Sequence, residues 1–157
     1  MRRVAVALGS NVGNRDEALS FAAAQMGLLF ENVRLSEIVE TWPLGENTEG
    51  QNLYLNAVLV GDTDLSARHV LDALLSIERA CGRERAYQNA PRTLDLDLIL
   101  LGDDIVVEPG LEVPHPRFRE RFFVLGPLAE VGADMTDPVS GQTVAQLLRT
   151  LLRDEAR

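Results

Sequence analysis

The sequence predicts an α+β fold in which helices pack on one face of an antiparallel sheet. Apolar residues alternate with other residues over 53–61 and 94–101, and this alternation is the period of a β-strand. Over 14–29 and 64–81 they recur instead at helical spacing. With two further strands expected before residue 42, the order is β-α-β-β-α-β, that of a ferredoxin-like unit. A C-terminal hairpin and further helices complete the prediction, and the fold alone implies no activity.

The composition is typical of a soluble globular protein, expected as a single domain over residues 1–157. Apolar residues make up 46% of the chain and charged residues 25%, which excludes a disordered or membrane-embedded class. The net charge of −9 argues against nucleic acid and anionic membranes as partners. No apolar run is long enough for a membrane span or a signal peptide. Because Cys81 is the only cysteine, no intramolecular disulfide is possible, and a reducing, cytoplasmic location is expected. No obligate protein partner is inferred from the sequence.

The first two-thirds of the chain supplies the predicted sheet and its two helices. The expected strands are 3–8, 33–41, 53–61 and 94–101, and the expected helices are 14–29 and 64–81. Asn14 is the predicted N-cap of the first helix, and Gly82 the C-cap of the second. Residues 83–90 form a polar loop before the last strand.

The remaining residues predict a hairpin, a rigid connector and helices. After a turn at 102–104, residues 105–107 are expected to return along the preceding strand. Prolines make 113–116 a rigid connector. The expected helices are 117–131, interrupted near Gly126 and Pro127, and 143–153 after a polar turn.

Two aspartates distinguish the strand 94–101. One face of the alternating pattern contains Leu94, Leu96, Leu98 and Leu100, and the other contains Asp95, Asp97 and Ile99. At about 3.3 Å per residue, the two aspartate Cα atoms lie roughly 6.5–7 Å apart. Both faces are mostly apolar, so we expect an interior strand with buried carboxylates, whose repulsion and desolvation require compensation. One interpretation is a structural pair bonded to backbone or to Arg92. A Mg²⁺ site is favoured, since Mg²⁺ takes one or two carboxylates plus substrate phosphates.

The basic residues gather around this strand. The chain has no lysine, and all fifteen basic residues are arginines. Codon bias explains the total but not the distribution, because seven of them flank or follow the aspartates: Arg79, Arg83, Arg85, Arg92, Arg117, Arg119 and Arg121. The planar guanidinium fork suits phosphate oxygens, so this distribution favours a phosphate-bearing ligand.

The strand 53–61 carries an aromatic ring and an amide on one face. Tyr54 and Asn56 point the same way, which suits a platform for a flat heterocycle; ordinary packing with a satisfied core amide is the alternative, and it is preferred on this strand alone. In the predicted sheet, Tyr54 and Asn56 occupy a strand neighbouring the aspartates, on the face that helices leave open. Aspartates, platform and arginines would then share one surface.

The stretch Pro91-Arg92-Thr93-Leu94-Asp95-Leu96-Asp97 resembles the signature of the 6-hydroxymethyl-7,8-dihydropterin pyrophosphokinase family. The resemblance extends over nearly the whole chain. The other matching segments are Gly9-Ser10-Asn11, Thr41 to Gly45, Tyr54-Leu55-Asn56-Ala57, Glu78 with 82–85, and Val113-Pro114-His115 with Arg121 and Phe123. Each of these segments is weak alone, but they occur in the order and approximate spacing of the family.

The resemblance implies a folate-pathway enzyme that transfers a diphosphate from ATP to the hydroxymethyl group of a reduced pterin, leaving AMP. It implies that Asp95 and Asp97 hold two Mg²⁺ ions and act in catalysis with Arg92. The implied triphosphate ligands are Arg85, Arg92, His115 and Arg121, with Glu78 on the ATP side. Without the resemblance, Glu78 reads equally well as an ion-pair partner of Arg79 or Arg83, and His115 as a surface turn residue.

The resemblance also implies where the pterin binds. Its ring would lie between Tyr54 and Phe123. Its polar edge would be read by Asn56 and by the backbone near Thr41, Trp42 and Leu44. Taken without the family, Phe123 is expected in the core.

Two other function classes compete with this one. A polymerase- or cyclase-type Mg²⁺-dependent transferase would also use paired aspartates on such a sheet, but it would not need Tyr54, Asn56 or the His115–Phe123 segment. The other class is a non-enzymatic ferredoxin-like module that binds a small molecule or RNA. RNA binding would need exposed aromatics and a basic sheet face, and the acidic charge and the paired aspartates disfavour it.

Overall fold

The computed structural model describes residues 1–11, 13–41, 53–82 and 94–155. Its elements in chain order are β1 (Arg2–Ser10), α1 (Arg15–Leu29), β2 (Glu31–Leu35), β3 (Val39–Thr41), β4 (Tyr54–Thr63), α2 (Ala67–Cys81), β5 (Asp95–Leu101), β6 (Val106–Glu108), β7 (Leu111–Val113), the 3₁₀ turn η1 (Phe118–Glu120), α3 (Phe122–Gly132) and α4 (Val144–Glu155). No helix within these ranges is long and apolar enough to cross a membrane.

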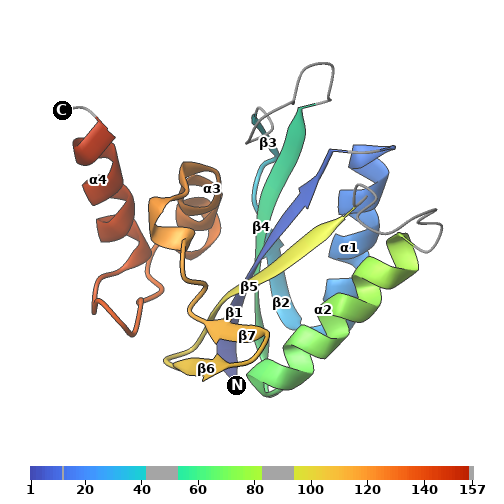
Figure 1. Ribbon diagram of the computed structural model, residues 1–157, viewed down its shortest axis with the longest axis horizontal. Coiled ribbons are helices and arrows are strands. Elements are labelled where there is room, and N and C mark those ends of the chain that lie inside the picture. The colour runs from blue at the N-terminus through green and yellow to red at the C-terminus, as the bar shows by residue number, and fades with distance from the viewer. Residues whose placement is uncertain (12, 42–52, 83–93, 156–157) are drawn as a thin grey trace.

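A five-stranded antiparallel sheet forms the centre of the molecule (Figure 1). Its order is β2-β4-β1-β5, and β3 pairs with β4 beside β2. Helices α1 and α2 cover one face, where Leu8, Leu59 and Leu74 belong to a common buried core. The predicted mixture of helices with an antiparallel sheet is confirmed. Burial of this apolar face supplies the main driving force for folding.

The second face of the sheet is partly covered, although the sequence predicted that helices leave it open. Helix α3 packs against the sheet and α4 packs on α3 on the side opposite α1 and α2 (Figure 1). Val58 and Ile99 from the sheet lie in one buried cluster with Leu125 and Leu128 of α3. The expectation was wrong because the mostly apolar α3 needs a partner surface, and Val58 and Ile99 provide it. The hollow that remains uncovered is therefore bounded by α3.

Strand β5 departs from the prediction in two ways. It pairs with β1 and, among the described residues, with no other strand, so it is an edge and not an interior strand. Its alternation holds through Ile99 and then fails, because the register with β1 shifts between Ala5 and Val6. At this β-bulge Leu100 turns to the α3 face beside Ile99, and Leu101 takes its place on the α1–α2 face.

The strand predicted over 33–41 is divided into β2 and β3. Ser36 lies between them, and its backbone N–H donates to the Val58 carbonyl oxygen. The buried Ser36 hydroxyl accepts the Val58 N–H at 2.9 Å, where a strand carbonyl would otherwise accept it. The serine hydroxyl thus replaces a strand carbonyl and interrupts the hydrogen-bond ladder with β4. The alternation of apolar residues along the sequence does not reveal this interruption.

The hairpin after β5 is also rearranged. Residues predicted to return along β5 form β6, which pairs with β7 in a separate two-stranded sheet. Gly110 has a φ of 76°, in the left-handed region that glycine adopts readily, and it makes the turn between these strands. The chain then returns to β5 at His115, whose N–H donates to the Ile99 carbonyl oxygen at 3.0 Å. This contact places His115 beside the aspartate strand.

Most predicted helix ends are confirmed. The Asn14 side chain accepts the Glu17 N–H at 3.1 Å, and Gly82 is the C-cap of α2. Helix α2 begins after Ser66, its N-cap, and not at residue 64. The break predicted near Pro127 lies instead at Arg121, whose extended backbone separates η1 from α3. Pro127 removes only one intrahelical hydrogen bond, and α3 continues through it.

A buried ion pair joins η1 to the turn before α4. The Asp137 carboxylate is completely buried and accepts from Arg119 Nε at 2.5 Å and Nη2 at 2.8 Å. Burial alone raises the pKa of Asp137, but hydrogen bonds from Arg119, Ser140 and the Val139 amide, with the charge of Arg119, lower it to about 2. The charged form is therefore the one that the folded chain stabilises.

We expect the stability of the protein to fall in acid through this group. The folded-state pKa lies below the ordinary 3.8, so the stabilisation is present above 3.8 and is lost as the pH falls toward 2. The expected loss in the free energy of unfolding is about 2 kcal/mol. Urea unfolding at a series of pH values measures it, and Asp137→Asn is expected to flatten the dependence. An identical pH dependence in that variant would contradict the assignment.

Candidate active site

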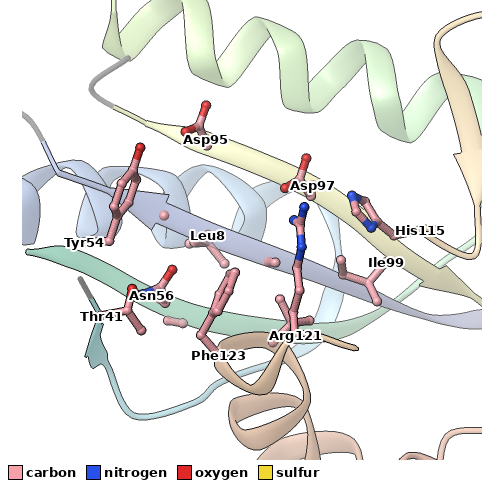
Figure 2. A pocket seen from close by; sticks show the side chains of 14 residues that line it. Leu8, Thr41, Tyr54, Asn56, Asp95, Asp97, Ile99, His115, Arg121 and Phe123 are labelled. Carbon is pink, nitrogen blue, oxygen red and sulfur yellow. Dashed lines mark hydrogen bonds between the residues drawn. The ribbon is translucent and has the colours of Figure 1, made fainter. Parts of the chain in front are cut away.

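A cavity of about 240 Å³ opens on the sheet face that α3 leaves uncovered. Strands β1, β4 and β5 form its floor, and residues 115–124 form one wall (Figure 2). Its lining residues are Ala7, Leu8, Gly9, Thr41, Tyr54, Asn56, Ala57, Asp95, Asp97, Ile99, His115, Arg121, Phe123 and Val124. Eight of them were candidate site residues from the sequence: Thr41, Tyr54, Asn56, Asp95, Asp97, His115, Arg121 and Phe123.

Small residues of β1 hollow out the floor. Gly9 is paired with Asn56 of β4 on one side and with Asp95 of β5 on the other. Ala7 is likewise paired with Asp97 in the next row. Tyr54 and Asn56 are therefore two strands away from the aspartates, and the prediction of directly neighbouring strands was wrong. The intervening glycine and alanine leave the space that larger side chains would fill.

The aspartates form an open acidic edge. Both side chains project from β5 into the cavity (Figure 2), Asp95 partly exposed and Asp97 exposed. The predicted shared face is confirmed, but the predicted burial is not, since an edge strand leaves them in contact with solvent. No cluster of three or more metal-binding side chains occurs in the described ranges. A pair of carboxylates fits Mg²⁺, which completes its shell with water and substrate phosphate.

The opposite side of the cavity is aromatic and polar. Burial, and then the negative charge of Asp95, raise the pKa of Tyr54, so its hydroxyl stays protonated at neutral pH. Asn56 Nδ2 donates to Thr41 Oγ1 at 2.8 Å and toward the Val39 carbonyl oxygen at 3.4 Å. A carbonyl only accepts, so the amide nitrogen faces β3 and Oδ1 faces the floor. Asn56 therefore presents a hydrogen-bond acceptor beside Gly9.

The wall adds cationic and aromatic groups. Arg121 reaches across the cavity toward Asp97 and His115, and the Phe123 ring stands over the floor (Figure 2). Burial lowers the pKa of His115, the charges of Arg121 and Arg117 lower it further, and Asp97 and Glu112 oppose them. The ring is thus neutral at pH 7, and Nδ1 accepts the Arg117 N–H at 3.2 Å. This tautomer leaves Nε2–H as a donor.

Comparison with known proteins decides the family. The family model described as 7,8-dihydro-6-hydroxymethylpterin-pyrophosphokinase (HPPK) matches residues 5–133. The chain belongs to the HPPK family. The resemblance predicted from the sequence is confirmed, and so is the predicted enzyme class, an ATP-dependent diphosphotransferase. The match ends before the turn that contains Asp137.

Two curated bacterial relatives are similar over most of their length. The 2-amino-4-hydroxy-6-hydroxymethyldihydropteridine pyrophosphokinase of Synechocystis sp. is 39% identical over 145 residues, covering 91% of this chain and 73% of that protein. The enzyme of the same name from Pseudomonas aeruginosa is 39% identical over 150 residues, covering 94% and 91%.

A solved structure shares the fold. The wild-type Plasmodium falciparum HPPK-DHPS crystal structure matches with a TM-score of 0.73 at 11% identity. The match covers 97% of this chain and 45% of that longer one. At this level of identity the likeness speaks for the architecture alone.

One described candidate residue of this HPPK-family chain, Glu78, does not line the cavity. Glu78 belongs to α2, and its carboxylate accepts the Leu96 N–H of β5 at 2.7 Å. The other four, Trp42, Leu44, Arg85 and Arg92, lie outside the described residues.

Six lining residues were not singled out as site residues from the sequence: Ala7, Leu8, Gly9, Ala57, Ile99 and Val124. Ile99 shares the alternating face with Asp95 and Asp97, so its position was open to prediction. Gly9 lies in a stretch that resembles the family. For Val124, an ordinary apolar residue of a helix, the sequence contains no distinguishing signal.

Proposed function

We propose that this protein transfers the diphosphate of ATP to the hydroxymethyl group of 6-hydroxymethyl-7,8-dihydropterin in a Mg²⁺-dependent reaction of folate biosynthesis. The products are AMP and the pterin diphosphate. One observation supports this most directly: a single cavity has an aromatic, amide-lined side and an acidic edge with a facing arginine. Such a cavity suits a flat, polar ring whose reactive arm points toward a metal-bound polyphosphate.

The aromatic side is assigned to the pterin. Tyr54 and Phe123 supply ring faces for stacking, which favours a flat heterocycle. Asn56 Oδ1, fixed by the bonds of Nδ2 to β3, suits the N–H groups of a pterin edge. Thr41 of β3 lies at the same side, and Trp42 and Leu44 are assigned there from the family resemblance.

The acidic edge and the wall are assigned to ATP. Asp95 and Asp97 would hold two Mg²⁺ ions, which neutralise phosphate charge and lower the pKa of the attacking hydroxyl. Arg121 and the Nε2–H of His115 face this edge and suit phosphate oxygens. Arg85, Arg92 and Glu78 complete the proposed ATP side on the family resemblance.

These residues act by positioning and by charge stabilisation. The pterin hydroxyl oxygen attacks the β-phosphorus of ATP and loses its proton. The bond from that phosphorus to the α,β-bridging oxygen breaks, and AMP leaves. Arg121 stabilises charge on the transferred phosphoryl oxygens, since such transfer needs little covalent chemistry from the protein.

We also infer that the site is carried by a ferredoxin-like unit within a single domain over residues 1–157. The strand order β2-β4-β1-β5 supports this, because the two βαβ halves interleave about β1 and β4.

Product analysis tests the proposal. The protein is incubated with ATP, Mg²⁺ and 6-hydroxymethyl-7,8-dihydropterin, and the products are separated and identified. AMP with a pterin diphosphate supports the proposed reaction. ADP with a pterin monophosphate would mean attack at the terminal phosphorus and would contradict the placement of the triphosphate. No turnover, with ATP still bound in a Mg²⁺-dependent way, would favour another acceptor and a different transferase.

Gly9→Ala is expected to raise the KM for the pterin about tenfold and to change the KM for ATP little. The new methyl group would enter the floor 3.7 Å from Asn56 Oδ1 and 4.0 Å from Tyr54 Cδ1, so the fold accepts it while the cavity loses space. Steady-state kinetics with each substrate varied measures both constants. Gly27→Ala adds the same group on α1, 3.9 Å from Val33 Cγ2 and away from the cavity, and is the matched control. Equal KM values for the pterin in both variants would remove Gly9 from the site.

A further inference from the structure

The wall of the cavity depends on a short connecting segment. Residues 115–124, called here the wall segment, run from β7 through η1 into α3 and contribute His115, Arg121 and Phe123. The His115 N–H anchors its start on the Ile99 carbonyl oxygen. Phe118, completely buried, anchors its middle. The direction of the Arg121 side chain depends on how firmly η1 is held, because Arg121 follows η1 directly.

The Arg119–Asp137 ion pair holds η1, and neither of its residues lines the cavity. The guanidinium of Arg119 donates two hydrogen bonds to one carboxylate, an arrangement that fixes angle as well as distance. Its Cζ also lies 4.8 Å from the centre of the Phe118 ring. Arg119 therefore connects the buried anchor of the wall segment to a charge in the turn before α4.

That charge is itself held rigidly. The Asp137 carboxylate accepts the Val139 N–H at 3.0 Å and the Ser140 hydroxyl at 2.7 Å. The backbone N–H of Asp137 donates to the Gln142 carbonyl oxygen, and the Gly141 N–H donates to the Asp137 carbonyl oxygen, both at 2.8 Å. These hydrogen bonds close the turn around the Asp137 carboxylate without any contribution from Arg119. Asp137 is thus a fixed point to which η1 is fastened.

Arg119 and Arg121 have opposite surroundings. Arg119 binds the turn before α4, whereas Arg121 projects into the cavity with its Cζ 5.9 Å from the Phe123 ring centre. We propose that the Arg119–Asp137 pair is a positioning device that holds Arg121 and Phe123 in the geometry the reaction needs. This inference rests on the proposed function, and it extends the working site to Asp137, which does not line the cavity.

A double-mutant cycle separates positioning from a merely structural role. Arg119→Ala as a single substitution is expected to lower kcat/KM about tenfold. In the Arg121→Ala background the same substitution is expected to lower it about threefold or less, because the effects of substitutions at coupled neighbouring residues are not additive. Asp137→Asn is expected to behave like Arg119→Ala, and Arg119→Lys to recover part of the loss. Asp134→Asn, which removes the exposed Arg3–Asp134 bond three residues earlier, is the matched control and is expected to leave kcat/KM unchanged. Equal losses in both Arg121 backgrounds would overturn the proposal.

Hydrogen–deuterium exchange gives a readout that needs no turnover. In Arg119→Ala and Asp137→Asn, the amides of residues 121, 124 and 125 are expected to exchange faster, because their acceptor carbonyls lie in the wall segment. The amides that bond between β1 and β4 are expected to keep their rates. Unchanged exchange in the wall segment would overturn the positioning role, and faster exchange throughout the chain would mark the pair as generally structural. Failure of the unmodified protein to turn over would instead count against the proposed function, with the exchange result still deciding the role of the pair.

Discussion

Asp97→Ala is expected to abolish turnover while the melting temperature stays unchanged or rises slightly. Metal-assisted charge stabilisation is worth several kcal/mol, so the loss in kcat is about a thousandfold or more. The fold is expected to tolerate the change because the Asp97 side chain is exposed on an edge strand, and its removal relieves repulsion from Asp95. Product formation at saturating ATP, Mg²⁺ and pterin measures the first effect, and thermal unfolding measures the second.

Asp103→Ala is the matched control for this experiment. Asp103 is an exposed aspartate in the turn that follows β5, and it does not line the cavity. Its replacement is expected to leave both kcat and melting temperature unchanged. A large fall in the melting temperature of Asp97→Ala would identify Asp97 as structural, and retained turnover would remove the acidic edge from the proposed mechanism.

The part of the site that lies on strands was predictable because a strand repeats every two residues. Asp95, Asp97 and Ile99 share one face as the alternation requires, and Tyr54 and Asn56 do the same on β4. The alternation could not show where it stops. The β-bulge opposite Ala5 and Val6 is a property of two paired strands, and it has no signature within either strand alone.

The wall of the site was not predictable in this way. The segment from β7 into α3 has no strand-like alternation, so only the family resemblance identified His115 and Phe123. Arg121 was also one of the seven arginines clustered around the aspartates. The covering of the second sheet face by α3 depends on which apolar surfaces meet, and the sequence shows that they exist without showing where they pack. The pairing of Arg119 with Asp137, eighteen residues apart, is a tertiary contact of the same kind.

Arg121→Ala is expected to lower kcat/KM about thirtyfold, the loss of roughly 2 kcal/mol that a charged hydrogen bond contributes to a transition state. Arg121 lines the cavity and faces His115 and Asp97, so its charge acts where phosphate is proposed to bind (Figure 2). Single-turnover and steady-state kinetics with ATP and the pterin separate a loss in binding from a loss in chemistry. Arg149→Ala, at an exposed position of α4 that does not line the cavity, is the matched control and is expected to retain activity.

Arg121→Lys decides what the side chain contributes. If recovery is nearly complete, a positive charge at this position suffices; if it is slight, the planar fork and its two-point contact with phosphate are required. The second outcome is expected. A positive charge alone would not require the support of the Arg119–Asp137 pair, whereas a planar guanidinium must be held in a fixed orientation to contact phosphate at two points. Unchanged kcat/KM in Arg121→Ala would contradict the role of Arg121 in the site, and it would also leave the Arg119–Asp137 pair with no catalytic group to position.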